Sequence, residues 1–193
     1  MATSTESVDL VGDEAATNLA RAALFAALVG AFAYVTFPNP VSPVSVTLQV
    51  LGVFLAGIYL GPVWGAASLV LYLVAGALGA PVFQGGSAGV GALGGESAGY
   101  LWSYPLAAAA VGAVVHRGAT LRDLDAVGLP TLVGAMVLGT AIIYALGVTG
   151  LVLVLSLGPV EAVTVGAAAF LPAEALKIAA AVGIVRSDAV AAA

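Results

Sequence analysis

Six long apolar stretches make up most of this 193-residue chain and limit what it can fold into. Hydrophobic residues account for 62% of the chain and charged residues for only 8%, against about 25% charged residues in a soluble domain. A helix needs about 20 mostly apolar residues to cross a bilayer. The pattern therefore predicts an all-α membrane protein, a six-transmembrane-helix bundle. The predicted helices span residues 19–37, 44–60, 63–80, 99–115, 130–155 and 170–185.

Proline and glycine separate the predicted helices. Pro38 and Pro40 end the first, because proline lacks the amide hydrogen that a helix requires. Gly61 and Pro62 form a tight turn between the second and the third. The connection at residues 156–169 leaves two alternatives open beside a plain loop: a re-entrant piece or a seventh short helix.

The charged residues predict how the chain lies in the membrane. Residues 1–18 are acidic and contain no Lys or Arg, unlike a signal peptide, so we expect a flexible cytoplasmic tail. Residues 19–187 are predicted to form one transmembrane domain, and residues 188–193 a short C-terminal tail. With six crossings, both termini and four of the five cations lie on the cytoplasmic side, as the positive-inside rule requires. These cations are Arg21, Arg117, Arg122 and Arg186.

Several function classes are excluded by what the sequence lacks. The chain has no cysteine and a single histidine, His116, which we interpret as a solvated loop residue, so we expect no metal site. There is no nucleotide-binding signature and no Ser/His/Asp set, which argues against an enzyme or a bound cofactor. Five scattered Lys and Arg residues are too few to follow the phosphates of a nucleic acid.

Glu174 and Lys177 are the strongest candidates for binding a ligand. They are three residues apart on one predicted helix, so they share a face. Ionisable groups inside the membrane are costly and usually face the bundle interior, paired with each other or with a ligand. A carboxylate and an ammonium together match a neutral cyclic urea, which has two N–H groups and one carbonyl. A purely structural ion pair remains the alternative.

The glycine-rich loop at residues 81–98 is a second candidate. Seven of the residues from Pro81 to Tyr100 are glycine, which permits close approach to a ligand and movement as a lid. A merely flexible connector is the alternative. Gln49, early in the second helix, is a further pocket candidate. Several aromatic residues near the predicted outer ends are also candidates: Tyr34, Phe37, Phe83, Tyr100, Trp102 and Tyr104.

Small residues on the first predicted helix recur at a spacing of four, a pattern that lets membrane helices approach closely. The two pairs are Ala22 with Ala26 and Ala23 with Ala27. They indicate either packing inside the bundle or contact with a partner subunit.

Short motifs in a fixed order carry a family resemblance that covers most of the chain. They are ALFAA at residues 23–27, PVSVTLQ at 43–49, LAGIYLGP at 55–62, LYLVAG at 71–76, PVFQGG at 81–86, GYL at 99–101 and FLPAEALK at 170–177. Taken together they resemble the BioY family, the biotin-specific S components of energy-coupling-factor (ECF) transporters. The resemblance implies the S-component fold in the plasma membrane, with biotin as transported substrate held beneath the loop at 81–98.

The resemblance also implies the roles of individual residues. The expected biotin-binding residues are Glu174, Lys177, Gln49, Phe83, Gln84, Gly85, Gly86 and Tyr100. The expected partners besides the lipid bilayer are an ECF coupling transmembrane subunit and two ATPase subunits. Ala22, Ala23, Ala26 and Ala27 are the expected interface with the coupling subunit.

The chain departs from the family pattern at Ala173 and Glu174, where the family has Gly and Asp, so the carboxylate is one methylene further from the backbone. Two alternatives stay open. The chain could be an S component for another vitamin or a biotin-related compound, or a structural membrane protein in which Glu174 and Lys177 serve packing alone.

Overall fold

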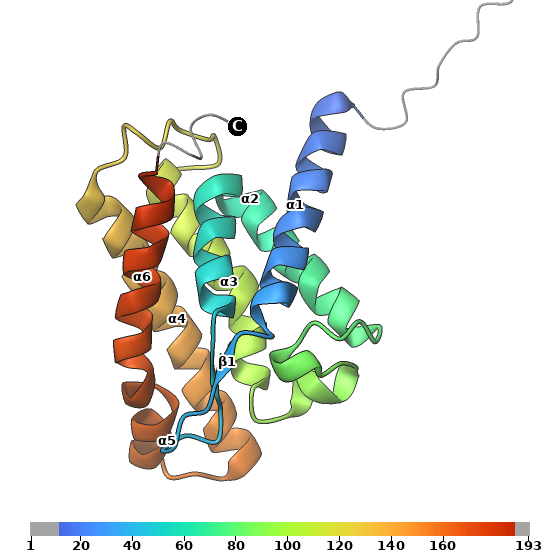
Figure 1. Cartoon of the computed structure of the whole chain (residues 1–193), viewed down its shortest axis with the longest axis vertical. Helices are drawn as coiled ribbons and strands as arrows, with labels where there is room; N and C mark the ends of the chain where they lie inside the picture. Colours follow the sequence, from blue (N-terminus) through green and yellow to red (C-terminus); the bar gives the residue numbers. More distant parts are fainter. Residues whose placement is uncertain (1–11, 188–193) are drawn as a thin grey trace, which may run out of the picture.

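The computed structural model describes residues 12–187, which fold into a bundle of helices with one small antiparallel sheet (Figure 1). The elements in chain order are α1 (Asp13–Phe32), β1 (Thr36–Phe37), β2 (Val46–Thr47), α2 (Gln49–Ala77), η1 (Gln84–Gly86), η2 (Val90–Gly94), α3 (Ala98–His116), α4 (Leu129–Leu155), α5 (Pro159–Gly166), η3 (Ala168–Phe170) and α6 (Leu171–Val185).

The first helix differs from the prediction at both ends. It begins at Asp13, so residues 13–18, which we expected in a flexible tail, form the first turns of α1. It ends at Phe32, because Thr36 and Phe37 leave the helix and pair with β2. Residues 1–11 and 188–193, the rest of the predicted tails, lie outside the described residues.

The second and third predicted helices together correspond to α2, which is broken at Gly61. Gly61 has a φ of 74°, a conformation that favours glycine, and Pro62 follows it. A Cβ on Gly65 would lie 3.1 Å from the Cα of Gly57, whereas eight residues of unbroken helix span about 12 Å. The chain therefore folds back at Gly61, and Figure 1 shows the two arms of α2 running in different directions.

Five stretches of residues 12–187 are long and apolar enough to cross a membrane, with α2 taken as one of them. The last runs through Pro159–Val185 and includes α5, η3 and α6. The connection predicted at residues 156–169 does contain a short helix, α5. Its eight residues are about 12 Å long, too short to span a bilayer alone.

Glycines set the close packing of α2 on α3. A Cβ on Gly57 would lie 2.5 Å from the carbonyl oxygen of Ala108, and a Cβ on Gly112 would lie 2.5 Å from the carbonyl carbon of Gly61. Neither position tolerates a side chain without a shift of the backbone. Small residues let membrane helices approach in this way, and van der Waals packing then stabilises the pair.

The two ends of the bundle carry different segments (Figure 1). The start of α1, the α3–α4 loop and the end of α6 lie at one end. The β1–β2 hairpin, the glycine-rich loop and α5 lie at the other.

The interpretation of His116 as a solvated loop residue is wrong. Its side chain is only 4% exposed, and Nε2 lies 2.8 Å from the carbonyl oxygen of Ile58. That carbonyl lacks a helical donor, because the residue four positions later is Pro62. Nδ1 accepts the amide hydrogen of Arg122 at 3.0 Å, so Nε2 carries the ring hydrogen and donates to Ile58. His116 thus replaces a hydrogen bond that the break in α2 removes.

Candidate functional site

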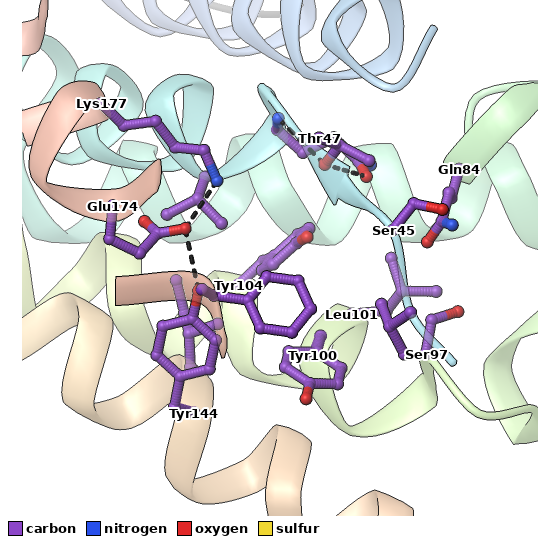
Figure 2. Close-up of a pocket in the computed structure, with 15 residues that line it drawn as sticks. Ser45, Thr47, Gln84, Ser97, Tyr100, Leu101, Tyr104, Tyr144, Glu174 and Lys177 are labelled. Atoms are coloured by element: carbon purple, nitrogen blue, oxygen red, sulfur yellow. Dashed lines mark hydrogen bonds and ion pairs between the residues drawn. The ribbon is translucent and has the colours of Figure 1, made fainter. Parts of the chain in front are cut away.

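A cavity lies at the end of the bundle that carries the β1–β2 hairpin and the glycine-rich loop (Figure 2). Its walls are formed by residues of the helices α2, α3, α4 and α6. Phe170 of η3, Gln84 of η1 and residues 44–47 also contribute. The lining residues are Val44, Ser45, Thr47, Gln49, Val50, Gln84, Ser97, Tyr100, Leu101, Tyr104, Ile143, Tyr144, Phe170, Glu174 and Lys177. Side chains from distant parts of the sequence therefore meet in one place.

The cavity is narrow in this conformation. The space between its side chains totals about 460 Å³ only when the part open to solvent is included. The cavity volume open to a water-sized molecule is only about 30 Å³, far below the roughly 300–1,000 Å³ of small-molecule pockets. A ligand of vitamin size requires the walls to move apart.

Glu174 and Lys177 occupy one end of the cavity. The Nζ atom of Lys177 lies 2.6 Å from Oε1 of Glu174, and the residues are 5% and 2% exposed, respectively. The hydroxyl of Tyr144 donates to the same Oε1 at 2.8 Å. Figure 2 shows both interactions converging on the one carboxylate oxygen. The expected shared face of the two charged residues is thus present, and it points into the cavity.

The second carboxylate oxygen of Glu174 is unused. Oε2 is buried and has no hydrogen-bond partner among residues 12–187. A buried acceptor left unpaired costs about 1–3 kcal/mol, and more when the group is charged. The Lys177 ammonium has three hydrogens, of which one is directed at Oε1. The pair therefore offers a ligand an unpaired acceptor, Oε2 of Glu174, beside the Lys177 ammonium, which has further hydrogens to donate.

Gln49 is fixed by two neighbours. Its Nε2 donates to the hydroxyl of Tyr72 at 2.5 Å, and its Oε1 accepts from the hydroxyl of Thr47 at 3.0 Å. Residues 46 and 47 form β2, so the hairpin that follows α1 holds this amide in the cavity wall. A fixed amide pays little further entropy when it meets a ligand.

Aromatic rings form the middle of the cavity. Tyr100 packs edge-on against Tyr144 with ring centroids 6.0 Å apart, and Phe170 lies 5.8 Å from Tyr144. The hydroxyl of Tyr100 donates to the carbonyl of Gly166 at 2.6 Å, which ties α3 to the end of α5. Tyr104 also lines the cavity (Figure 2). This region suits a flat or compact apolar group.

Ser45, Gln84 and Ser97 gather at the other end of the cavity, away from Glu174 (Figure 2). All three carry neutral hydrogen-bonding groups that can donate to a ligand. The cavity is therefore polar at both ends and aromatic between them.

Five of the eight predicted ligand-binding residues line the cavity: Glu174, Lys177, Gln49, Gln84 and Tyr100. Phe83, Gly85 and Gly86 do not. Phe83 is 1% exposed and packs behind the cavity, against Gly76 and Tyr72. Gly85 and Gly86 have positive φ values of 63° and 82° and turn the loop, as glycine permits.

Four polar residues of the lining were not predicted from the sequence: Tyr144, Thr47, Ser45 and Ser97. Tyr144 carried a signal, because it is the single aromatic residue in the apolar helix α4. The two serines and Thr47 carried none, since nothing in the sequence shows which way a loop side chain points.

The four alanines of the first helix divide into two pairs. Ala22 and Ala26 are buried in the bundle, where the hydroxyl of Ser68 donates to the carbonyl of Ala22 at 2.8 Å. Ala23 and Ala27 are exposed. Together with the buried Ala26, they line an apolar groove of about 260 Å³ between α1 and α2. The other residues of this groove are Leu71, Tyr72, Ala75 and Val82.

The model of the BioY family matches residues 3–192 of the chain. This chain belongs to the BioY family. A biotin transporter BioY of Rhodobacter capsulatus is 37% identical over 169 residues, which is 83% of this chain and 87% of the relative. A biotin transporter BioY of Thermotoga maritima is 35% identical over 131 residues, covering 68% and 72% of the two chains. These relatives are named as transporters, not as enzymes.

A solved structure shares the fold of this family member. It is the crystal structure of the S component for biotin from an ECF-type ABC transporter. The TM-score is 0.81, with 92% of this chain and 93% of the other covered and 22% of residues identical. The expected S-component fold is thus confirmed, while the six crossings remain a prediction.

Proposed function

We propose that this protein binds biotin in the cavity and serves as the substrate-capturing subunit of a biotin uptake transporter. The observation that carries the proposal is the unpaired Oε2 of Glu174 beside Lys177, both buried at the cavity wall. A pair with a purely structural role gains nothing from leaving one carboxylate oxygen buried without a donor.

The urea ring of biotin matches this end of the cavity. Its N–H groups supply the donor that Oε2 of Glu174 lacks, and its carbonyl accepts from Lys177. The hydrogen bond from Tyr144 fixes the carboxylate before the ligand arrives. Charge-assisted hydrogen bonds of this kind are about twice as strong as neutral ones.

The other parts of biotin match the rest of the cavity, from the Glu174 end through the aromatic middle to the Gln84 end. The fused rings fit between Tyr100, Tyr104 and Phe170. The carboxylate tail then reaches Gln84, Ser45 and Ser97, whose neutral donors can pair with it. The match in sequence to biotin transporters BioY supports this choice of vitamin over others.

The proposal is tested by equilibrium binding of labelled biotin to the purified full-length protein in lipid nanodiscs. We expect a dissociation constant below ~1 μM, which corresponds to about 8 kcal/mol. Competition with excess riboflavin and thiamine should leave binding unchanged, whereas unlabelled biotin should displace the label completely. Binding weaker than ~1 μM, or displacement by either of the other vitamins, contradicts the proposal.

We further propose that the chain crosses the plasma membrane six times, with both termini in the cytoplasm. The break in α2 at Gly61 supports six crossings, because each of its arms runs in its own direction. The start of α1, the α3–α4 loop and the end of α6 lie at one end, and the last two carry Arg117, Arg122 and Arg186. Arg21 of α1 lines a cleft with Thr120 and Leu121 of the α3–α4 loop. The positive-inside rule assigns that end to the cytoplasm.

Transport in this proposal depends on partner subunits, an ECF coupling transmembrane subunit and two ATPases. The structural likeness to an ECF S component supports this context. The exposed alanines Ala23 and Ala27, with the groove beside them, are the proposed contact with the coupling subunit. Ala22 and Ala26 are buried, so their proposed contribution is to the close packing of α1 on α2.

A further inference from the structure

Two consecutive side chains fasten the glycine-rich loop to the bundle, and each occupies the space above a glycine. A Cβ on Gly76 would lie 2.5 and 2.6 Å from Cε1 and Cε2 of Phe83. Val82 packs in the same way on α1, where a Cβ on Gly30 would lie 3.0 Å from its Cγ1 atom. Each glycine thus forms a socket for one side chain of the loop.

Backbone hydrogen bonds close the loop around this anchor. The amide of Gly89 donates to the carbonyl of Gly76 at 2.7 Å, and the amide of Gly85 donates to the carbonyl of Ala33 at 3.2 Å. The amide of Phe83 itself donates to the carbonyl of Ser87 at 3.0 Å. The loop is therefore held against both α1 and α2 at the position of Phe83.

Phe83 does not line the cavity, but it is adjacent to residues that line the cavity or hold its wall in place. The next residue, Gln84, is part of the lining. The ring of Phe83 meets Tyr72 edge-on, with centroids 5.4 Å apart and an interplanar angle of 80°. The hydroxyl of Tyr72 in turn accepts from Gln49, a second amide of the lining. Displacing Phe83 would therefore disturb two amides of the cavity wall at once.

We infer that Phe83 is a positioning residue that latches the glycine-rich loop over the cavity through the Gly76 socket, and that release of this latch admits and discharges the ligand. The inference rests on the proposed function for the identity of the ligand. The narrowness of the cavity supports it, because a space of only about 30 Å³ must widen before biotin enters. Loops that close over a site move about a few hinge residues, which are often small.

Loop mobility tests the latch without any ligand. The chain contains no cysteine, so Ala88→Cys gives a single site for a nitroxide on the exposed part of the loop. In this background, Gly76→Ala expels the Phe83 ring and Phe83→Ala removes it. We expect both changes to increase nitroxide mobility in the electron paramagnetic resonance spectrum. Gly134→Ala is the matched control, since a Cβ there meets nothing within 4 Å, and should leave mobility unchanged.

Biotin kinetics test the consequence for the ligand. Phe83→Ala and Gly76→Ala should raise the dissociation rate of biotin tenfold or more, and Phe83→Leu should restore part of the loss by refilling the socket. Tyr72→Phe keeps the ring contact with Phe83 but loses the bond to Gln49. Tyr72→Phe should weaken biotin binding without increasing loop mobility. This result would separate the role of Phe83 in holding the loop from the role of Tyr72 in holding the Gln49 amide.

The outcomes also separate this inference from the proposed function. Unchanged mobility in Gly76→Ala and Phe83→Ala, or dissociation rates within twofold of the parent, overturns the latch even where biotin binds well. Increased mobility with no biotin binding by the parent protein supports the latch and contradicts biotin as the ligand. Phe83→Leu is measured in both assays, so a failure of Phe83→Ala to fold leaves the test intact.

Discussion

The hydroxyl of Tyr144 donates to Oε1 of Glu174 at 2.8 Å, and the same oxygen accepts a hydrogen bond from Lys177. This arrangement turns the other oxygen of the carboxylate, Oε2, into the unpaired acceptor of the cavity. Tyr144 therefore controls how the carboxylate faces a ligand, although it lies on a different helix, α4.

Tyr144→Phe is expected to weaken biotin binding about threefold to tenfold. The change removes one hydrogen bond to a charged group, a class of interaction that contributes about 1.5–3 kcal/mol when intact, and Lys177 still holds the carboxylate. Binding isotherms of the variant and the parent protein provide the measurement. An affinity within experimental error of the parent contradicts the orienting role of Tyr144.

His116→Ala is expected to lower stability and spare the ligand site. It leaves the buried carbonyl of Ile58 without a donor, at a cost of about 1–3 kcal/mol. His116 and the cavity residue Tyr100 lie at opposite ends of α3, about 24 Å apart along the helix axis. The transition temperature in nanodiscs should fall while the biotin affinity stays within twofold. A normal transition temperature shows that His116 is not needed to satisfy Ile58.

Gly112→Ala is expected to destabilise the bundle, because the added Cβ would lie 2.5 Å from the backbone of Gly61 on α2. Overpacking of this kind costs about 1–3 kcal/mol. Gly183→Ala on α6 is the control, since its Cβ meets nothing within 4 Å. There, alanine should be neutral or stabilising by up to about 1 kcal/mol. Thermal unfolding of both variants provides the comparison, and equal effects contradict the close crossing of α2 and α3.

Ala26→Leu and Ala27→Leu are expected to separate packing from partner contact. Ala26 is 8% exposed inside the bundle, so leucine there overpacks the contact of α1 with α2 and lowers stability. Ala27 is exposed in the groove, so leucine should leave folding and biotin binding intact but reduce uptake in cells that supply the partner subunits. Normal uptake by Ala27→Leu removes Ala27 from the proposed interface.

Relationships between residues close together in the chain could be predicted from the sequence. The three-residue spacing of Glu174 and Lys177 placed both on one helical face, and the structure shows that face at the cavity. Gly61 and Pro62 marked the turn in the apolar region, because proline and glycine act on the backbone of their own residues. The crossing number of six stays a prediction, since five apolar spans are counted with α2 as one of them.

Contacts between residues far apart in the chain could not be predicted from the sequence. His116 was misplaced because its partner, Ile58, is 58 residues away and lost its helical donor through Pro62. Tyr144 meets Glu174 across 30 residues, and no periodicity reports such a pairing. Phe83 was expected at the ligand, but its ring fills the space above Gly76, a fit that depends on the path of the loop.

The central claim is that Glu174 and Lys177 bind a ligand and are not only a structural pair. The most direct test is the biotin dissociation constant of Glu174→Ala and Lys177→Ala, measured on variants whose helix content by circular dichroism matches the parent protein. The account predicts that each change raises the dissociation constant tenfold or more, or at least ~1.4 kcal/mol. Parent-like biotin affinity in both folded variants contradicts it and leaves the pair a structural one.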